Sequence, residues 1–162
     1  GSQLDQALRA ALAMGAEWFR AEVLSELAGK LEGAQLDQAL RAALEMENED
    51  ARALALSGLA PQLQGEQLNT ALRAALEIEE EDACAQALSG LVDQLTQPEQ
   101  IWQVKKAILE IFSGSLEEHR STVLSILGWP ALVTPRLLGL TSEEFGLIAD
   151  SVIQITTQWR WL

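Results

Sequence analysis

Leucine and alanine recur along the middle of the chain at the spacing of an amphipathic helix. Between residues 36 and 44 (LDQALRAAL) they fall three or four positions apart, which places them on one face of a helix. The acidic run at 47–50 interrupts this pattern, and a second apolar stripe follows it. Gly65, just after that stripe, is a typical helix stop. The pattern therefore predicts a helical hairpin with helices over 34–46 and 49–63.

The same hairpin recurs along the chain. Residues 4–12 are identical to residues 36–44, and a divergent copy begins at Ile101. The leucines that open the first three copies stand 32 residues apart, at Leu4, Leu36 and Leu68. A repeat of this length indicates a stacked array, because one hairpin is too small to bury its own apolar face and its neighbours must cover it.

We therefore predict an all-α fold, an α-solenoid of stacked antiparallel helical hairpins with about ten helices and no sheet. Seven of the predicted helices cover 3–14, 16–31, 34–46, 49–63, 66–78, 81–95 and 98–112, and three more follow from residue 115. The predicted repeats are 3–33, 34–65, 66–97 and 98–127, within one continuous domain that ends in a divergent capping hairpin at 128–162.

Small residues recur in the second helix of each hairpin. Ser57-Gly58 and Ser89-Gly90 occupy equivalent mid-helix positions, where glycine costs about 1 kcal/mol relative to alanine. A cost that recurs in register predicts that second helices of neighbouring hairpins approach each other closely. A ligand groove at these positions is the alternative.

The unit ALRAALEMENEDARALALSGLAPQL (39–63) resembles the short α-solenoid repeats, HEAT-like or TPR-like, of bacterial and especially cyanobacterial multidomain signalling proteins. The resemblance covers about residues 3–127, and DARA at 50–53 is similar to the start of the second HEAT helix. It implies a non-catalytic protein–protein interaction scaffold. The alternative is a regulatory or sensor fragment of a larger signalling enzyme, an NTPase or a protease, with no chemistry of its own.

Charge narrows the choice of partners. The formal net charge is −13, and residues 1–97 carry 17 acids against 6 bases. Such a surface repels phosphate backbones and anionic membranes, so we expect neither nucleic acid nor a membrane as partner. No apolar run approaches the roughly 20 residues that span a bilayer. The single cysteine, Cys84, excludes an internal disulfide and fits a reducing, cytoplasmic location.

Catalytic and metal-binding patterns are missing from the sequence. His119, the one histidine, lies beside Glu117 and Glu118 without a nucleophile motif, and we interpret it as a surface residue. Cys84 lies between alanines and reads as a small hydrophobic residue. The acidic turns lack the alternating ligands and central glycine of a calcium loop. We expect no enzymatic activity, no metal and no cofactor.

The turns inside the hairpins form the most distinctive predicted surface. Stacking at roughly 10 Å should align their carboxylates along one edge of the array, and this acidic edge is our candidate site for a basic protein partner. Its predicted members are Glu45, Glu47, Glu49, Asp50, Glu77, Glu79, Glu80, Glu81 and Asp82.

Two columns of basic residues also repeat in register. The first helices carry Arg9, Arg41, Arg73 and Lys106 on their outer face, where acids four residues away predict solvated ion pairs. The second helices carry Arg20, Arg52, Cys84 and Arg120 on the side of the core leucines. We interpret this second column as structural, with arginine stems on the core and guanidinium groups on nearby acids.

The first hairpin has no covering neighbour in this sequence, although residues 4–12 match an interior copy. An exposed face of that kind marks an interaction site. We therefore expect self-association there, as a twofold dimer or by end-to-end stacking. The candidate residues are Leu4, Leu8, Trp18 and Phe19.

Overall fold

The computed structural model describes residues 2–113. This part of the chain is all-α, without a strand. Its helices are α1 (Ser2–Leu12), α2 (Glu17–Leu27), α3 (Ala34–Leu44), α4 (Glu49–Leu59), α5 (Gly65–Leu76), α6 (Glu81–Val92) and α7 (Pro98–Ser113). Short 3-10 turns, η1 (Ala28–Lys30) and η2 (Ala60–Gln62), extend α2 and α4.

The helical periodicity predicted these elements well. All seven helices expected between residues 3 and 112 are present, within a few residues of their predicted ends. The described range thus contains seven helices, against about ten predicted for the whole chain. The remaining three helices, the second half of the repeat at 98–127 and the capping hairpin at 128–162 lie outside the described residues.

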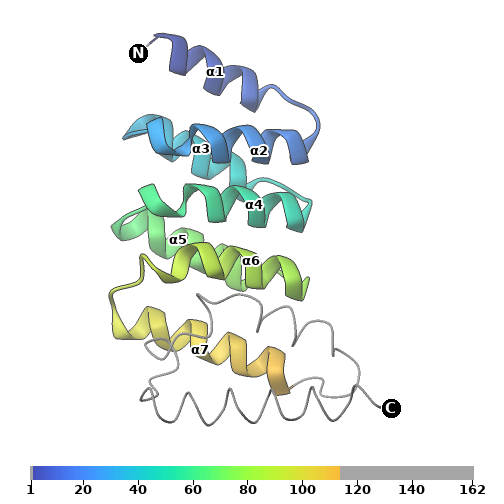
Figure 1. Cartoon of the computed structure of the whole chain (residues 1–162), viewed down its shortest axis with the longest axis vertical. Coiled ribbons are helices and arrows are strands. Elements are labelled where there is room, and N and C mark those ends of the chain that lie inside the picture. Colours follow the sequence, from blue (N-terminus) through green and yellow to red (C-terminus); the bar gives the residue numbers. More distant parts are fainter. Residues whose placement is uncertain (1, 114–162) are drawn as a thin grey trace, which may run out of the picture.

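The helices pack against one another in two series (Figure 1). The first helices of the hairpins, α1, α3, α5 and α7, contact each other in chain order. The second helices, α2, α4 and α6, do the same, and each packs on the first helix of its own hairpin. Turns inside hairpins lie on the right-hand edge in Figure 1, and connections between hairpins on the left. This arrangement is compatible with a helical repeat.

One continuous core runs through the described hairpins, and it is built almost entirely from leucine and alanine. Equivalent positions are buried in successive copies. Leu56 and Leu88 of the second helices are fully buried, as are the alanines at 39 and 71 of the first helices. Burial of apolar area is the main source of stability in such a fold.

The chain reverses between α2 and α3 and between α4 and α5 at glycines with a left-handed backbone. Gly33 and Gly65 have φ angles of 51° and 53°, which L side chains rarely adopt. α4 ends at Leu59 and η2 at Gln62, so the prediction that Gly65 closes the second helix is wrong. Gly65 instead begins α5, because its positive φ turns the chain into the next hairpin.

The recurring small residues bring the second helices into backbone contact, as predicted. A Cβ atom added to Gly58 would lie 2.8 Å from the Cα atom of Ser25. A Cβ atom added to Gly90 would lie 2.6 Å from the Cα atom of Ser57. The alternative of a ligand groove is wrong, because the neighbouring serine fills the space. Ser57 also donates its hydroxyl to the carbonyl of Leu54, at 3.0 Å.

A single methyl group should therefore disturb the stack. In an open helix Gly→Ala stabilises by about 1 kcal/mol, but Gly58→Ala should destabilise by about 1–3 kcal/mol because α2 and α4 must move apart. Urea unfolding followed by circular dichroism measures this change. Gly29→Ala is the control, because no atom lies within 4 Å of its Cβ position. Equal effects of the two substitutions would contradict the close approach.

Candidate protein interaction surface

Each described turn at the predicted acidic edge is held by a carboxylate from the preceding hairpin. Glu17 accepts hydrogen bonds from the backbone N–H groups of Glu47 and Asn48, at 3.1 and 2.7 Å. Glu49 accepts the equivalent pair from Glu79 and Glu80, again at 3.1 and 2.7 Å. Two backbone donors of each turn are thereby satisfied by a charge on the neighbouring hairpin.

The arginines of the second helices support these carboxylates. Arg20 pairs with Glu17 at 3.4 Å, and Arg52 pairs with Glu49 at 3.2 Å. Both arginine side chains are 21% exposed, which agrees with the prediction of stems lying on the core. The column is structural in the described hairpins: each arginine fixes the acid that holds the next turn.

These contacts shift the acidity of both carboxyl groups. The pKa of Glu17 lies below its ordinary value, first because of the N–H of Asn48 and then that of Glu47. The pKa of Glu49 is lowered in the same way, first by the N–H of Glu80. The nearby guanidinium groups lower both pKa values further, while partial burial acts in the opposite direction.

A second set of bonds connects the first helices. Gln35 donates its amide to Asp5, Gln67 to Asp37, and Gln100 to Asn69 in the same register. The aspartates are therefore engaged across hairpins, and the predicted ion pair between Asp37 and Arg41 is wrong. Arg41 is exposed, whereas Arg20 and Arg52 on the second helices form ion pairs with Glu17 and Glu49.

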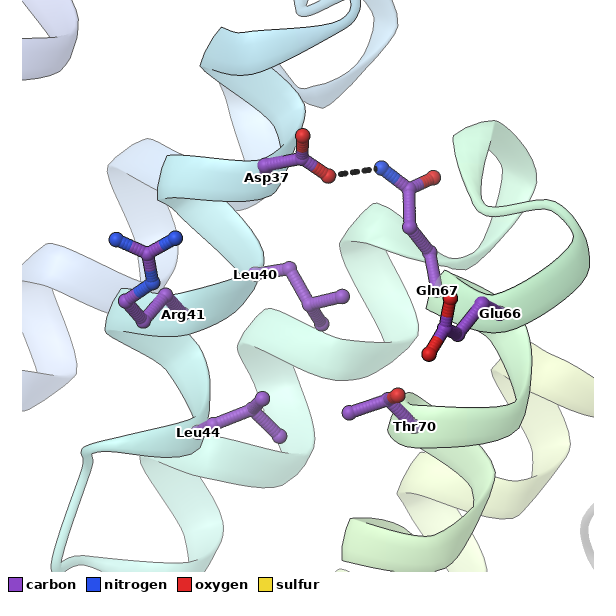
Figure 2. A pocket seen from close by; sticks show the side chains of 7 residues that line it. All are labelled: Asp37, Leu40, Arg41, Leu44, Glu66, Gln67 and Thr70. Carbon is purple, nitrogen blue, oxygen red and sulfur yellow. Dashed lines mark hydrogen bonds between the residues drawn. The ribbon is translucent and has the colours of Figure 1, made fainter.

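An open groove separates the first helices α3 and α5 (Figure 2). The Gln67–Asp37 bond crosses one end of this groove, and Leu40 and Leu44 lie along its side. Its volume is 280 Å³, and Arg41 and Thr70 also line it. The first helices are thus joined through side chains, whereas the second helices touch through their backbones. The residues that line the groove do not form a convergent set of polar groups that would recognise a ligand.

The acidic edge contains two kinds of carboxylate. Glu49 holds the next turn, and Glu80 caps α6 by accepting the N–H of Ala83 at 2.6 Å. Asn48 caps α4 in the same way, through the N–H of Ala51. Six of the predicted members are exposed, and their side-chain carboxylates take no part in these caps and turn contacts: Glu45, Glu47, Asp50, Glu77, Glu79 and Asp82. Glu81 is half-buried at the position equivalent to Glu17 and Glu49.

The predicted self-association residues do not form one exposed set. Leu8 is 2% exposed and belongs to the core, and Leu4 is half-buried against it, so placing Leu8 on an exposed margin was wrong. Trp18 and Phe19 are exposed by 52% and 61%. Met14, which the sequence interpretation passed over, is 37% exposed beside them in the chain. The open apolar surface therefore lies on α2 and the turn before it, not on α1.

The remaining candidates for chemistry have structural surroundings. Burial, and then the charges of Glu49 and two further acids, raise the pKa of the Cys84 thiol to about 11, so it is protonated at neutral pH. His119 lies outside the described residues. Within residues 2–113, no three histidine, cysteine or acidic side chains are grouped to hold a metal ion. No helix in that range is long and apolar enough to cross a membrane.

Comparison with protein-family models, with curated proteins and with solved structures finds no match to this chain.

Acidification should test the turn contacts. A carboxyl whose pKa is lowered on folding stabilises the fold above its unfolded pKa of about 4.3 and loses that contribution as pH falls through the folded pKa. Glu49→Gln should therefore be less stable than the parent at pH 7, and the two should converge below about pH 4. Thermal unfolding across this range measures the difference. Glu47→Gln, at an exposed carboxylate, should follow the parent's curve at every pH; a loss of stability at pH 7 as large as that of Glu49→Gln would contradict the assignment.

The two arginine columns should respond differently to truncation. Arg52→Ala removes a half-buried stem and the partner of Glu49, and should cost about 1–2 kcal/mol. Arg41→Ala removes an exposed side chain and should change the free energy of unfolding by less than about 0.5 kcal/mol. Urea unfolding of both variants measures the difference, and equal losses would contradict the structural role of Arg52.

Proposed function

We propose that this protein is a non-catalytic protein–protein interaction scaffold, an α-solenoid of short HEAT-like or TPR-like hairpins, and that its acidic edge binds a basic protein. Consecutive hairpins support this proposal because they share the same helix packing and the same two sets of connecting bonds. A surface feature of one hairpin is therefore repeated at a fixed offset on the next.

The observation that carries the proposal is that the turn does not need its exposed acids to fold. The turn at 13–16 (AMGA) connects α1 to α2 over the same length as 45–48 (EMEN) and 77–80 (EIEE). The residues before α2, α4 and α6 share an extended backbone, with ψ of 112°, 117° and 118°. Because the first turn adopts this conformation with no acid in it, the acids of the other two turns, apart from the α6 cap Glu80, are free to serve another purpose.

Those acids are presented in a way that suits binding. The backbone at Glu47 and Glu79 is fixed by the carboxylates of Glu17 and Glu49, so the exposed side chains stand on ordered turns. Ordered turns reduce the entropy lost on association. Two successive turns with the same sign of charge attract lysine and arginine at long range and speed the encounter.

Selective neutralisation of the acidic edge tests this function. The edge variant carries Glu45→Gln, Asp50→Asn, Glu77→Gln and Asp82→Asn. The matched control carries Glu32→Gln, Glu66→Gln, Asp93→Asn and Glu99→Gln, which are exposed acids near the connections between hairpins, at the opposite edge. Both variants have the same net charge, so a difference between them reports position rather than total charge.

The probe is a labelled lysine-rich peptide of about 20 residues, followed by fluorescence anisotropy. The parent should bind it, more weakly as salt rises past about 0.1 M. The edge variant should lose roughly tenfold in affinity, about 1.4 kcal/mol, and the control much less. Equal losses of affinity in the two variants would show that overall charge, and not the acidic edge, determines binding, which would contradict the proposed site. No binding by the parent, or salt-sensitive binding of DNA, would refute the function.

A further inference from the structure

The first hairpin departs from the others where they form the acidic edge. Residues 13–18 read AMGAEW, against EMENED at 45–50 and EIEEED at 77–82. Glu17, which holds the next turn, is retained. Around it the acids are replaced by small or apolar residues, and Trp18 stands where the other hairpins have Asp50 and Asp82. The edge therefore changes from acidic to aromatic at its N-terminal end.

The same change continues on the face of α2 that points away from α4. In α4 and α6 the equivalent face packs on the preceding second helix, and its positions 51 and 83 are buried alanines. In α2 that position is Phe19, which is 61% exposed. Met14 is 37% exposed, whereas Met46, its equivalent in the next hairpin, is 1% exposed. We call Met14, Trp18 and Phe19 the aromatic end.

Another hairpin of the same kind does not fit on this face. The close contact between second helices requires glycine at 58 and 90, where an added Cβ would overlap the neighbouring serine. The equivalent residue of α2 is Glu26, whose side chain blocks so close an approach. A twofold dimer through this face is also disfavoured. It would bring the exposed Glu22 and Glu26 of one copy next to the same two glutamates of the other, and like charges repel.

Charge complementarity instead selects a basic occupant. The aromatic end is flanked on α2 by the exposed acids Glu22 and Glu26, and along the edge by the exposed acids of the next two turns. Exposed tryptophan and phenylalanine supply large, rigid contact area of the kind that anchors interfaces. A segment with apolar residues at one end and lysine or arginine beyond them complements both features at once.

We propose that the aromatic end is the anchor site for a basic, amphipathic segment of a partner protein, which then runs along the acidic edge. This inference rests on the proposed function and adds a direction to it: the apolar end of the segment lies at α2 and its basic part lies over the turns before α4 and α6. With hairpins roughly 10 Å apart and a helical rise of 1.5 Å per residue, the basic clusters should lie about 7 and 14 residues from the anchor, positions that share the anchor's face of a helix.

The test uses the full chain and two helical peptides of about 20 residues. The anchored peptide has a Leu-Trp pair at one end and lysine pairs about 7 and 14 residues away on the same helix face, and it is made in both chain directions. The unanchored peptide has serines in place of the Leu-Trp pair. Binding is measured by fluorescence anisotropy of an attached dye, since the protein contains five tryptophans of its own.

The test variant is Trp18→Asp with Phe19→Ala. These changes install the residues that the chain already has at 50–51 and 82–83, so they are compatible with the fold. The matched control is Trp102→Asn, which removes a tryptophan that is 60% exposed on α7 and installs the residue of the equivalent position 69. Circular dichroism and thermal unfolding establish that all variants are folded.

The anchored peptide is compared in whichever chain direction binds more tightly. We expect the parent to bind it at least tenfold more tightly than the unanchored peptide. The test variant should lose this advantage and bind the unanchored peptide at least as tightly as the parent does, since Trp18→Asp adds one acid to the edge, while Trp102→Asn should change neither affinity. Equal binding of both peptides by the parent, or an unchanged advantage in the test variant, would overturn the anchor and leave the proposed function standing. If neither peptide binds, the proposed function fails and the anchor fails with it.

Two other occupants are distinguished by the same variants. Sedimentation of the parent at tens of micromolar should show monomer; a dimer that Trp18→Asp with Phe19→Ala dissolves would show that a second copy covers the aromatic end. Vesicles of a zwitterionic lipid should not bind; binding that the same variant abolishes would assign the aromatic end to a membrane surface. Either result would overturn the proposal.

Discussion

The arrangement of the described hairpins depends on one carboxylate in each of the second helices α2 and α4. Glu17 and Glu49 each stand at the start of a helix and accept two backbone N–H groups from the turn of the following hairpin. Those N–H groups precede a helix, where donors have no partner within the helix itself. One side chain thus satisfies the backbone of its neighbour and sets the offset between the two hairpins.

The two series of helices achieve their fit by different means. Second helices approach until a glycine of one meets a serine of the next, so their separation is fixed by backbone contact. First helices are connected by amide and carboxylate side chains such as Gln67 and Asp37, which leaves the groove of Figure 2 between them. A backbone contact tolerates almost no change in side-chain size, whereas a side-chain bond tolerates adjustment. The stack is therefore most tightly specified along its second helices.

The sequence predicted what depends on local spacing and repetition. The leucine and alanine period located the helices, and glycine recurring at 58 and 90 predicted the close approach, because both signals lie within one helix. The bonds between hairpins were not predicted, because the partners of Glu17 and Glu49 are backbone groups about thirty residues away that have no side-chain signature. The one available signal was glutamate at 17, 49 and 81, in register where its neighbours vary.

The error at the N-terminal end has a related cause. Residues 4–12 are identical to 36–44, and identity alone suggested that both their faces need cover. Leu8 is nevertheless buried in the core, since α1 packs on both α2 and α3, and the uncovered face belongs to α2. Sequence identity between copies therefore does not locate an open face; differences at structurally equivalent positions do.

Differences between the repeats at equivalent positions also show which residues the fold needs and which can vary without changing it. A glutamate begins each of α2, α4 and α6, at positions 17, 49 and 81, and the first two hold the backbone of the next hairpin. The residues around them change from alanine, glycine and tryptophan in the first turn to acids in the next two, while the backbone before each second helix stays the same. A position that varies over an unchanged backbone is free of the packing constraint, so its chemistry is available for contacts outside the chain. In this protein such positions form one edge, aromatic at α2 and acidic beyond it.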